Sequence, residues 1–318
     1  MRNYPKDPQE FFETTNDKLW IKNNVMLPYD PSKKPKDYLL LLSVNLHTYQ
    51  EKEQEAKFSS IVQALYDLRP DVVLLQECAQ NKEATIIKKH YDKEIKKDNM
   101  AHIICSMLRD NHSINYDYYW DWSHYGWNEW EEGVAILTPH KIIRTESKYV
   151  TTNQTKTFWK SRNIAMATVD ITSIGKINFF SIHTGWWNDK PDPFNTQFEN
   201  IIEWEESIKN GAIATILAGD FNIEAGSEGY TFIEDKDKYI DIYRKANPHG
   251  FYDPTIGGKI DGWEKGMPTG KRIDYIFINK DADFTTVMSQ RIFTKKSYGR
   301  VSDHTGVYAV LKKGKNPQ

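Results

Sequence analysis

The 318-residue chain has 42 basic and 44 acidic residues, giving a formal net charge of −2, and 39% of its residues are hydrophobic. Its mean hydropathy of −0.68 and the lack of a long apolar run in the sequence exclude a membrane-spanning helix, so we expect no membrane partner. The nearly neutral net charge argues against a protein that binds nucleic acid, because such proteins typically have a basic patch or a high pI.

The first 37 residues differ in composition from the rest and predict an N-terminal extension. They contain five prolines and the charged run from Lys33 to Asp37. They also contain large apolar residues that a disordered tail rarely carries, namely Phe11, Phe12, Trp20 and Met26. We expect residues 1–37 to be packed on the surface or partly disordered, without a catalytic role. The sequence has no apolar signal-peptide segment, so we expect a cytoplasmic protein, or a secreted one if a signal peptide has been removed.

Two apolar runs in the first half of the chain end in polar residues. The run YLLLLSVN delivers Asn45 and is followed by His47, and the run DVVLLQE delivers Glu77. Continuous runs of this length are typical of strands that are covered on both faces. Residues 56–69 and 194–209 have apolar residues at helical spacing, so each segment is predicted to form an amphipathic helix.

A further helix is predicted from Glu83 to Leu108, where lysines are interleaved with acids. These lysines form either a phosphate-binding surface or a solvated helix face, and we favour the second because runs of mixed charge usually face water. We expect no exposed apolar hairpin in the chain. The two cysteines, Cys78 and Cys105, are too few for a disulfide scaffold or a zinc site, and we expect Cys78 in the core.

Three segments in the second half also place polar residues at strand ends. The run INFFSIH ends in His183, and the run ILAGDFN ends in Asp220 and Asn222. Because Asp220 and Asn222 are two apart, they point to the same side of an extended chain. Asp303 and His304 stand just before the apolar run VYAVL. Five strand edges with Asn, Glu, His or Asp side chains predict one shared site.

Six motifs stand in the order SVN, LLQE, SIH, GDFN, RIDYIF and SDH between Tyr38 and Leu311. In this order they resemble the endonuclease/exonuclease/phosphatase superfamily, which includes DNase I-like nucleases, inositol polyphosphate 5-phosphatases and bacterial sphingomyelinases. The resemblance implies a DNase I-like α/β (α+β) fold, a four-layered sandwich of two packed mixed β-sheets flanked by helices. It also implies one domain over residues 38–313 with a tail at 314–318, and divalent-metal-dependent cleavage of phosphate esters.

The resemblance further implies a metal site. Glu77 is the expected ligand, Asn45 on the neighbouring strand end would add its carbonyl oxygen, and Asp303 would bind a second metal. Magnesium is the expected ion, with manganese as an alternative, because a hard cation takes few protein carboxylates and coordinates substrate oxygens. Without the family context, Glu77 would be an ordinary carboxylate at a strand end.

Five residues have expected catalytic roles. Asp220 would orient and deprotonate the attacking water, and Asn222 would donate a hydrogen bond to the phosphoryl group. His183 and His304 would clamp the phosphate. The resemblance also implies that Asp274, in the RIDYIF motif, orients His304 and fixes its tautomer. The alternative for each histidine is an ordinary surface or core residue.

Residues near these motifs predict the kind of substrate. Trp186 and Trp187 follow the SIH motif, and Trp263 precedes RIDYIF. Adjacent residues of an extended chain face opposite sides, so we expect one of the first two to line the cleft and the other to face the core. The resemblance implies that Arg162, which stands before an apolar strand, binds two phosphate oxygens, and His47 is a further substrate-binding candidate. Flat aromatic faces beside polar side chains suit a sugar, and aromatics also stack on bases.

Within the superfamily, the segments HTGWWND, WKSR and KIDGW resemble the bacterial maltose 6'-phosphate phosphatases, which are cytoplasmic enzymes that dephosphorylate an imported disaccharide phosphate. We therefore expect a phosphomonoesterase that hydrolyses a sugar phosphate by in-line attack of water. The alternatives are a magnesium-dependent phosphodiesterase acting on DNA or on a phospholipid headgroup, and a catalytically inactive binding module of the same fold. The N-terminal extension and the lysine-rich stretch depart from the resemblance and leave the exact substrate open.

Overall fold

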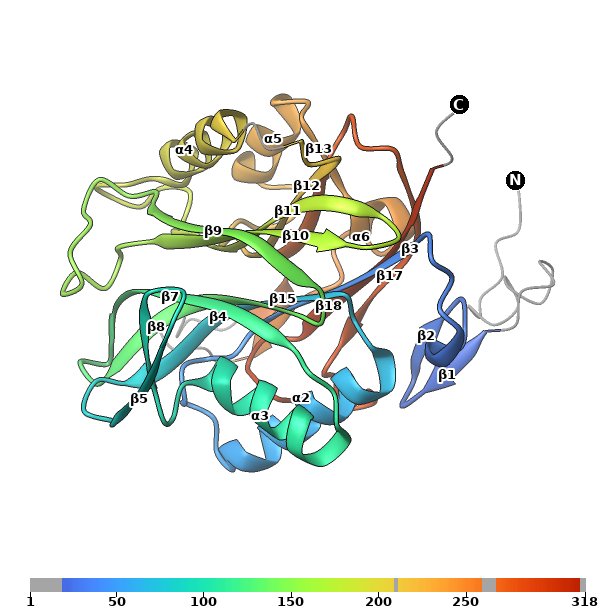
Figure 1. The fold of residues 1–318 in the computed structure, drawn as a ribbon. Coiled ribbons are helices and arrows are strands. Elements are labelled where there is room, and N and C mark those ends of the chain that lie inside the picture. The colour runs from blue at the N-terminus through green and yellow to red at the C-terminus, as the bar shows by residue number, and fades with distance from the viewer. Residues whose placement is uncertain (1–18, 209–210, 259–266, 315–318) are drawn as a thin grey trace.

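Two six-stranded mixed β-sheets lie face to face at the centre of the protein (Figure 1). The computed structural model describes residues 19–208, 211–258 and 267–314. The first sheet has the strand order β17-β18-β3-β4-β8-β7, and the second has the order β13-β16-β12-β11-β10-β9. Helices cover the outer face of each sheet, so the predicted four-layered α/β sandwich is confirmed.

Each large sheet combines strands that are far apart in the sequence. The first sheet contains β3 (Tyr38–Asn45), β4 (Val72–Asn81), β7 (Asp117–Gly126), β8 (Trp130–Thr138), β17 (Phe284–Ile292) and β18 (Gly306–Lys313). The second contains β9 (Lys141–Tyr149), β10 (Asn163–Ile171), β11 (Gly175–His183), β12 (Ala214–Asp220), β13 (Tyr239–Asp241) and β16 (Asp274–Asn279). Three small hairpins pair β1 (Trp20–Lys22) with β2 (Val25–Leu27), β5 (Ile86–His90) with β6 (Lys93–Lys96), and β14 (Ile256–Gly258) with β15 (Met267–Lys271).

The apolar run of β3 shows why the sequence forms this sandwich. Successive residues of a strand point to opposite faces. Leu39 and Leu41 pack between the two sheets, whereas Leu40 and Leu42 pack against the helices of the first outer layer. All four are buried, as expected for a strand that is covered on both sides.

The helices form the two outer layers (Figure 1). The first layer contains α2 (Gln54–Leu68) and α3 (Met100–His112), and the second contains α4 (Phe194–Ser207) and α5 (Glu228–Asp235). Two shorter elements are α6 (Ile242–Ala246) and the 3-10 helix η1 (Pro31–Lys33). The helices predicted at residues 56–69 and 194–209 correspond to α2 and α4. No helix among the described residues is long and apolar enough to cross a membrane.

The strand pairing brings the polar strand ends together. In the second sheet, β11 and β12 are parallel, and His183 is opposite Asp220. On the other side of β12, the antiparallel strand β16 places Asp274 opposite Asp220. In the first sheet, β3 and β4 are parallel and place Asn45 opposite Gln76, the residue before Glu77. Asp220 therefore lies between His183 and Asp274 in one sheet, at the edge where β3 and β4 of the other sheet also end.

The helix predicted from Glu83 to Leu108 is wrong in its first half. This part forms the hairpin β5–β6, and helix α3 begins only at Met100, after Asn99 caps it by accepting a hydrogen bond from the backbone nitrogen of His102. The chain reverses at Tyr91 and Asp92, both of which have left-handed backbone angles. The turn is stabilised by Asp117, whose carboxylate accepts a hydrogen bond from the Tyr91 hydroxyl, a contact that lies far along the sequence.

Two expectations about this segment are corrected by the hairpin. Two lysines, Lys93 and Lys96, form salt bridges with Asp121 and Glu131, so they do not form one solvated helix face. Ile86 and Ile87 are 48% and 45% exposed, so the expectation of no exposed apolar hairpin is wrong. The prediction that Cys78 lies in the core is confirmed, because its side chain is fully buried.

The described part of the N-terminal extension packs against the first sheet. Val25 and Leu27 of β2 are fully buried, and the side chain of Gln290 on β17 donates a hydrogen bond to the backbone oxygen of Met26. Lys34 forms a salt bridge with the buried Asp71. Trp20 also packs against this core, whereas Phe11 and Phe12 lie outside the described residues. Treating residues 1–37 as a separate extension remains a prediction.

Gly219 is expected to be essential for the junction between β11 and β12. Its φ of +146° lies in a region that other residues rarely adopt, and an added Cβ would lie 2.0 Å from the backbone oxygen of Ile182. We expect Gly219→Ala to lower the free energy of unfolding by about 3 kcal/mol, measured by chemical denaturation. The control is Gly257→Ala, whose added Cβ would have its nearest contact at 3.4 Å. Equal stability of the two variants would contradict this account.

Candidate active site

A cavity of about 920 Å³ opens at the edge where these strands end. Most of the residues predicted from the sequence line it, namely His47, Glu77, Arg162, His183, Trp186, Trp187, Asp220, Asn222, Asp303 and His304. Asn45 and Asp274 contact residues of this lining directly. Trp263 lies outside the described residues. The structure thus brings the predicted residues that it describes into one site, and their individual roles remain predictions.

Glu77 reaches the cavity through an irregularity in β4. The pairing of β4 with β8 shifts register between Leu75 and Cys78, and Glu77 has a φ of +45°. A β-bulge of this kind redirects a side chain that would otherwise point into a sheet face. A left-handed backbone at a residue other than glycine is also characteristic of functional sites.

Asn45 connects the two carboxylates at the centre of the site. Its side-chain nitrogen donates hydrogen bonds to Glu77 Oε1 at 2.8 Å and to Asp220 Oδ2 at 3.1 Å. Its side-chain oxygen accepts a hydrogen bond from the backbone nitrogen of His47 at 3.0 Å. In this arrangement Asn45 turns its amide nitrogen, and not its carbonyl oxygen, toward the carboxylates. The predicted metal contact of that oxygen would require the amide to rotate.

Two histidines flank Asp220 at equal distances. The Nε2 atoms of His183 and His304 each lie 3.8 Å from Asp220 Oδ2. His304 Nδ1 is 2.9 Å from Asp274 Oδ2, so the structure pairs His304 with the residue predicted to orient it. The backbone nitrogen of Asn222 donates a hydrogen bond to Asp220 Oδ1 at 2.9 Å, which fixes the carboxylate from the other side.

The two histidines lie in opposite electrostatic environments. Burial, together with the nearby Arg162 guanidinium, lowers the pKa of His183 well below its usual value. Burial also opposes the charged form of His304, but the Asp274 carboxylate outweighs this effect and raises the pKa of His304 well above its usual value. Burial raises the pKa of Asp220 to about 7, against the opposing effect of His304. At neutral pH the site therefore contains one neutral and one charged imidazole.

The donor groups of the site fit a hard divalent cation. Glu77, His183 and Asp220 form one group whose ligand atoms lie within 4.8 Å of one another. Burial, and then the nearby carboxylates of Glu132 and Asp303, raise the pKa of Glu77 well above its usual value. A cluster of buried carboxylates that repel one another is stabilised by a bound cation, and carboxylate oxygens are the ligands that magnesium prefers.

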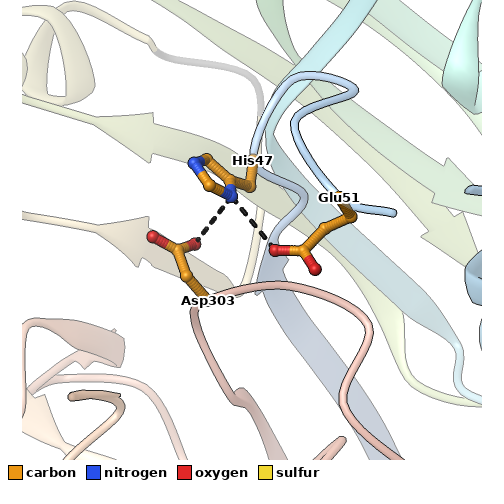
Figure 2. Close-up of side chains that lie close together, drawn as sticks. All are labelled: His47, Glu51 and Asp303. Atoms are coloured by element: carbon orange, nitrogen blue, oxygen red, sulfur yellow. Dashed lines mark hydrogen bonds and ion pairs between the residues drawn. The ribbon is translucent and has the colours of Figure 1, made fainter. Parts of the chain in front are cut away.

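His47, Glu51 and Asp303 form a further donor group (Figure 2). His47 Nδ1 is 3.1 Å from Glu51 Oε1 and 3.5 Å from Asp303 Oδ1. His47 thus connects the loop after β3 to the loop before β18. Glu51 was not predicted from the sequence, because it lies four residues after His47 and not at a strand end.

Glu132 and His124 also line the cavity, from β8 and β7, and were not predicted from the sequence. Glu132 accepts a hydrogen bond from the Thr48 hydroxyl at 2.8 Å, and its Oε1 lies 3.3 Å from His124 Nε2. His124 Nδ1 faces the backbone oxygen of Ser161, so this nitrogen carries a proton. Burial opposes the charged form of Glu132, but His124, followed by His183 and Arg162, lowers the pKa of Glu132 to about 2.

Arg162 is a buried cation on the cavity wall. It is 4% exposed, and its NH1 group donates a hydrogen bond to the backbone oxygen of Trp159 at 3.2 Å. Its Nε atom is buried without a hydrogen-bond partner among the described residues. Within the same ranges, no carboxylate lies within salt-bridge distance of its guanidinium. The two lysines beside the cavity differ, because Lys160 pairs with Asp189 and Lys271 pairs with Glu224.

Trp186 and Trp187 both line the cavity, whereas one of them was expected to line it and the other to face the core. Trp187 packs against Phe194 and Phe232 of the second outer layer, and its Nε1 donates a hydrogen bond to Glu228. Trp186 lies beside Arg162, with 6.0 Å between the guanidinium carbon and the ring centre. Trp186 therefore belongs to the binding wall, and Trp187 connects that wall to the core.

The sequence profile of the Endonuclease/Exonuclease/phosphatase family matches residues 42–304, which covers most of the chain. No curated protein matches the chain. A solved structure of an endonuclease/exonuclease/phosphatase family protein from Leptotrichia buccalis is similar, with 28% identity and a TM-score of 0.75, covering 86% of this chain and 99% of that one.

Two more distant structures share the fold. One is a mannosyl-6-phosphatase from Bacteroides thetaiotaomicron, with 17% identity and a TM-score of 0.58, covering 86% of this chain and 99% of that one. The other is D. rerio TDP2 complexed with a single-strand DNA product, with 18% identity and a TM-score of 0.60, covering 87% and 99%. At these identities the likeness concerns the fold alone.

Proposed function

Because the chain belongs to the endonuclease/exonuclease/phosphatase family, we propose that it is a metal-dependent phosphoric ester hydrolase that releases phosphate from a sugar phosphate similar to maltose 6'-phosphate. The observation that carries this proposal is Arg162, a buried cation without a carboxylate partner among the described residues. It lies on the wall of the cavity that also contains Glu77, Asp220 and both histidines.

A phosphate group would give the Arg162 guanidinium the direct partner that it lacks among the described residues, since the carboxylates of Glu132 and Glu77 act on it from beyond salt-bridge distance. A buried charge is costly unless it is paired and hydrogen-bonded. A guanidinium binds two phosphate oxygens through parallel N–H groups, and this geometry is specific to arginine. The buried Nε atom of Arg162, which has no partner in the described ranges, is a donor available for such a contact.

The cavity lining favours a small sugar phosphate over nucleic acid. The shared fold does not choose between them, since it is found both in a mannosyl-6-phosphatase and in a protein bound to a DNA product. A nucleic acid backbone is bound through several unpaired cations. Here Lys160 and Lys271 are neutralised by Asp189 and Glu224, and the chain has a formal net charge of −2. With these lysines paired, Arg162 is the cation that we expect to bind phosphate, and it can bind one phosphate group.

The chain's own residues divide the work of the reaction. Asp220 lies between the two imidazoles, where it orients the attacking water and accepts its proton. His304 is kept charged by Asp274 and donates a hydrogen bond to a phosphoryl oxygen. His183, at the end of β11, donates a second one. A divalent cation held by Glu77 would neutralise phosphate charge and stabilise the leaving oxygen, and Asp303 would hold a second cation if one binds.

A phosphate-release screen tests the proposal. Sugar phosphates, inositol phosphates, nucleotides, a phospholipid and plasmid DNA are each offered with magnesium. We expect phosphate release from a disaccharide 6-phosphate with a weak salt dependence of KM, because one phosphate releases few counterions. Efficient nicking of DNA without turnover of any sugar phosphate would replace this proposal by the nuclease alternative. No turnover of any substrate would favour an inactive binding module.

The phospholipid arm of the screen has a specific motivation. Ile86 and Ile87 on β5 expose apolar side chains next to Lys88 and Lys89, a combination that suits a lipid surface. This hairpin keeps a phosphodiesterase that acts on a phospholipid headgroup as the second candidate. Release of a headgroup from vesicles, without phosphate release from sugar phosphates, would select it.

Arg162→Lys tests the phosphate contact directly. Lysine keeps the charge but loses the planar pair of donors, so we expect KM for the sugar phosphate to rise about tenfold, and about a hundredfold in Arg162→Met. Steady-state kinetics with the best substrate of the screen measure the effect. The control is Arg144→Met on β9, an exposed arginine that pairs with Glu146. Unchanged kinetics in Arg162→Met would show that the phosphate binds elsewhere.

A further inference from the structure

Two half-exposed tryptophans stand on the wall of the cavity, and the proposed reaction does not use them. Trp127 is 48% exposed and Trp159 is 53% exposed, and both line the cavity. They come from different sheets, since Trp127 lies in the turn between β7 and β8, and Trp159 lies in the loop between β9 and β10. Large aromatic side chains left exposed at a cavity are typical of a binding site.

We propose that Trp127 and Trp159 form an outer subsite that stacks on the second sugar ring of a disaccharide phosphate, while Arg162 holds its phosphate. This inference rests on the proposed function and adds the residues that select a two-ring substrate over a one-ring substrate. A volume of about 920 Å³ is near the upper end of the range of about 300–1,000 Å³ for small-molecule sites, so the cavity has room beyond a single phosphorylated ring.

Trp127 has a fixed position at the end of a paired hairpin. Trp127 and Asn128 both have positive φ, which matches the tight turn between the antiparallel strands β7 and β8. The ring of Trp127 lies 6.2 Å from that of His47, in an edge-to-face arrangement. His47 is in turn held by Glu51 and Asp303 (Figure 2), so the Trp127 ring packs against a side chain that is itself fixed.

Trp159 is held in place by its own loop and by charged neighbours. Its backbone oxygen accepts a hydrogen bond from Arg162, and its ring lies 6.0 Å from that of Trp186. The Lys160 ammonium lies 5.1 Å from the centre of the Trp159 ring and forms a salt bridge with Asp189. A preorganised aromatic face loses little conformational entropy when a ligand binds to it.

The polar groups around these rings suit hydroxyl groups. Asn188 is exposed at the cavity, and Asp189 and Glu224 also line it, so amide and carboxylate groups are available as partners for sugar hydroxyls. Asp189 and Glu224 are paired with Lys160 and Lys271, so neither lysine is available to a second phosphate. A sugar ring presents a flat C–H face to an aromatic ring and hydroxyls at its edges, which matches both features.

The test compares two substrates in matched variants. The ratio of kcat/KM for maltose 6'-phosphate to kcat/KM for glucose 6-phosphate is measured in the unmutated protein, in Trp127→Ala and in Trp159→Ala. We expect each variant to lower this ratio at least about tenfold, because stacking on one aromatic ring contributes about that much to binding. The control is Tyr66→Ala on α2, an exposed aromatic that stacks on His112 away from the cavity, and its ratio is expected to stay unchanged.

Competitive inhibition of p-nitrophenyl phosphate hydrolysis gives a second readout that needs no sugar phosphate. We expect maltose to inhibit more strongly than glucose, and this difference to disappear in Trp159→Ala. An unchanged ratio together with equal inhibition by the two sugars would overturn the subsite and leave the proposed sugar phosphatase intact. Hydrolysis of p-nitrophenyl phosphate without turnover of either sugar phosphate would overturn both. Stronger inhibition by a nucleoside than by maltose, lost in Trp159→Ala, would assign the tryptophans to a base.

Discussion

Glu77→Gln is expected to lower turnover at least about a hundredfold, which corresponds to about 3 kcal/mol of activation free energy. The substitution keeps the shape of the side chain and its place beside Asn45, but it removes the charge that would hold a cation. The effect is measured as kcat at saturating magnesium, and circular dichroism establishes that the fold is intact. Glu55→Gln, at the exposed start of α2, is the matched control and should be as active as the unmutated protein.

Removal of the metal should have the same effect as the Glu77 substitution. We expect EDTA to abolish activity, and magnesium or manganese to restore it. A second readout does not depend on turnover, because a ligand that binds only the folded state raises the melting temperature. Magnesium should therefore stabilise the unmutated protein and not Glu77→Gln. Full activity in EDTA would contradict a metal-dependent mechanism.

The strands that carry the site were predictable from the sequence because buried strands consist mainly of apolar residues. A strand that is covered on both faces is apolar over most of its length, as β3 is from Leu39 to Leu42, and such a run is easily recognised in the sequence. The polar residue that ends such a run marks the edge of a sheet. Asn45, His183 and Asp220 were found in this way, and pairing of β11 with β12 then places His183 opposite Asp220.

Glu132 was missed because it lies at the beginning of its apolar run and not at the end. Strand β8 runs antiparallel to β4, so the first residues of β8 lie at the same edge as the last residues of β4. In the segment WEEGVAIL the polar residues therefore come before the apolar run, whereas in the other strands of the site they come after it. A search of both ends of each apolar run would have identified Glu132, whereas His124 lies inside β7 and gives no such signal.

The hairpin β5–β6 was not predictable from local pattern, because its stability depends on distant partners. Tyr91 and His90 bond to Asp117, and Lys93 bonds to Asp121, so the turn depends on β7.

The orientation of the Asn45 side chain was not predictable either, for a similar reason. Its amide is fixed by the backbone nitrogen of His47 and by two carboxylates, one of which is far along the chain. Neither the composition nor the spacing of residues indicates which way the amide of Asn45 is turned.

His183→Ala and His304→Ala are each expected to lower turnover at least about a hundredfold while the protein remains folded. Both imidazoles lie 3.8 Å from the same oxygen of Asp220, so a phosphoryl group bound there would contact both at once. Residues that act as one unit give losses that do not multiply. The double variant should therefore be much more active than the product of the two single losses implies. Turnover of p-nitrophenyl phosphate and the melting temperature are measured for all three variants.

The contribution of Asp274 separates the two histidines. Asp274 contacts His304 and keeps it charged, whereas His183 is kept neutral by burial and by Arg162. Asp274→Asn should therefore reduce turnover about as much as His304→Ala, and should cause little further loss in the His304→Ala background. In the His183→Ala background, Asp274→Asn should reduce turnover by less than it does in the unmutated protein if the two histidines act as one clamp. An equal reduction in both backgrounds would indicate that the histidines hold the phosphate independently. Strictly multiplicative losses in the double variant His183→Ala/His304→Ala would show that the two histidines have separate functions, and the clamp would then be wrong.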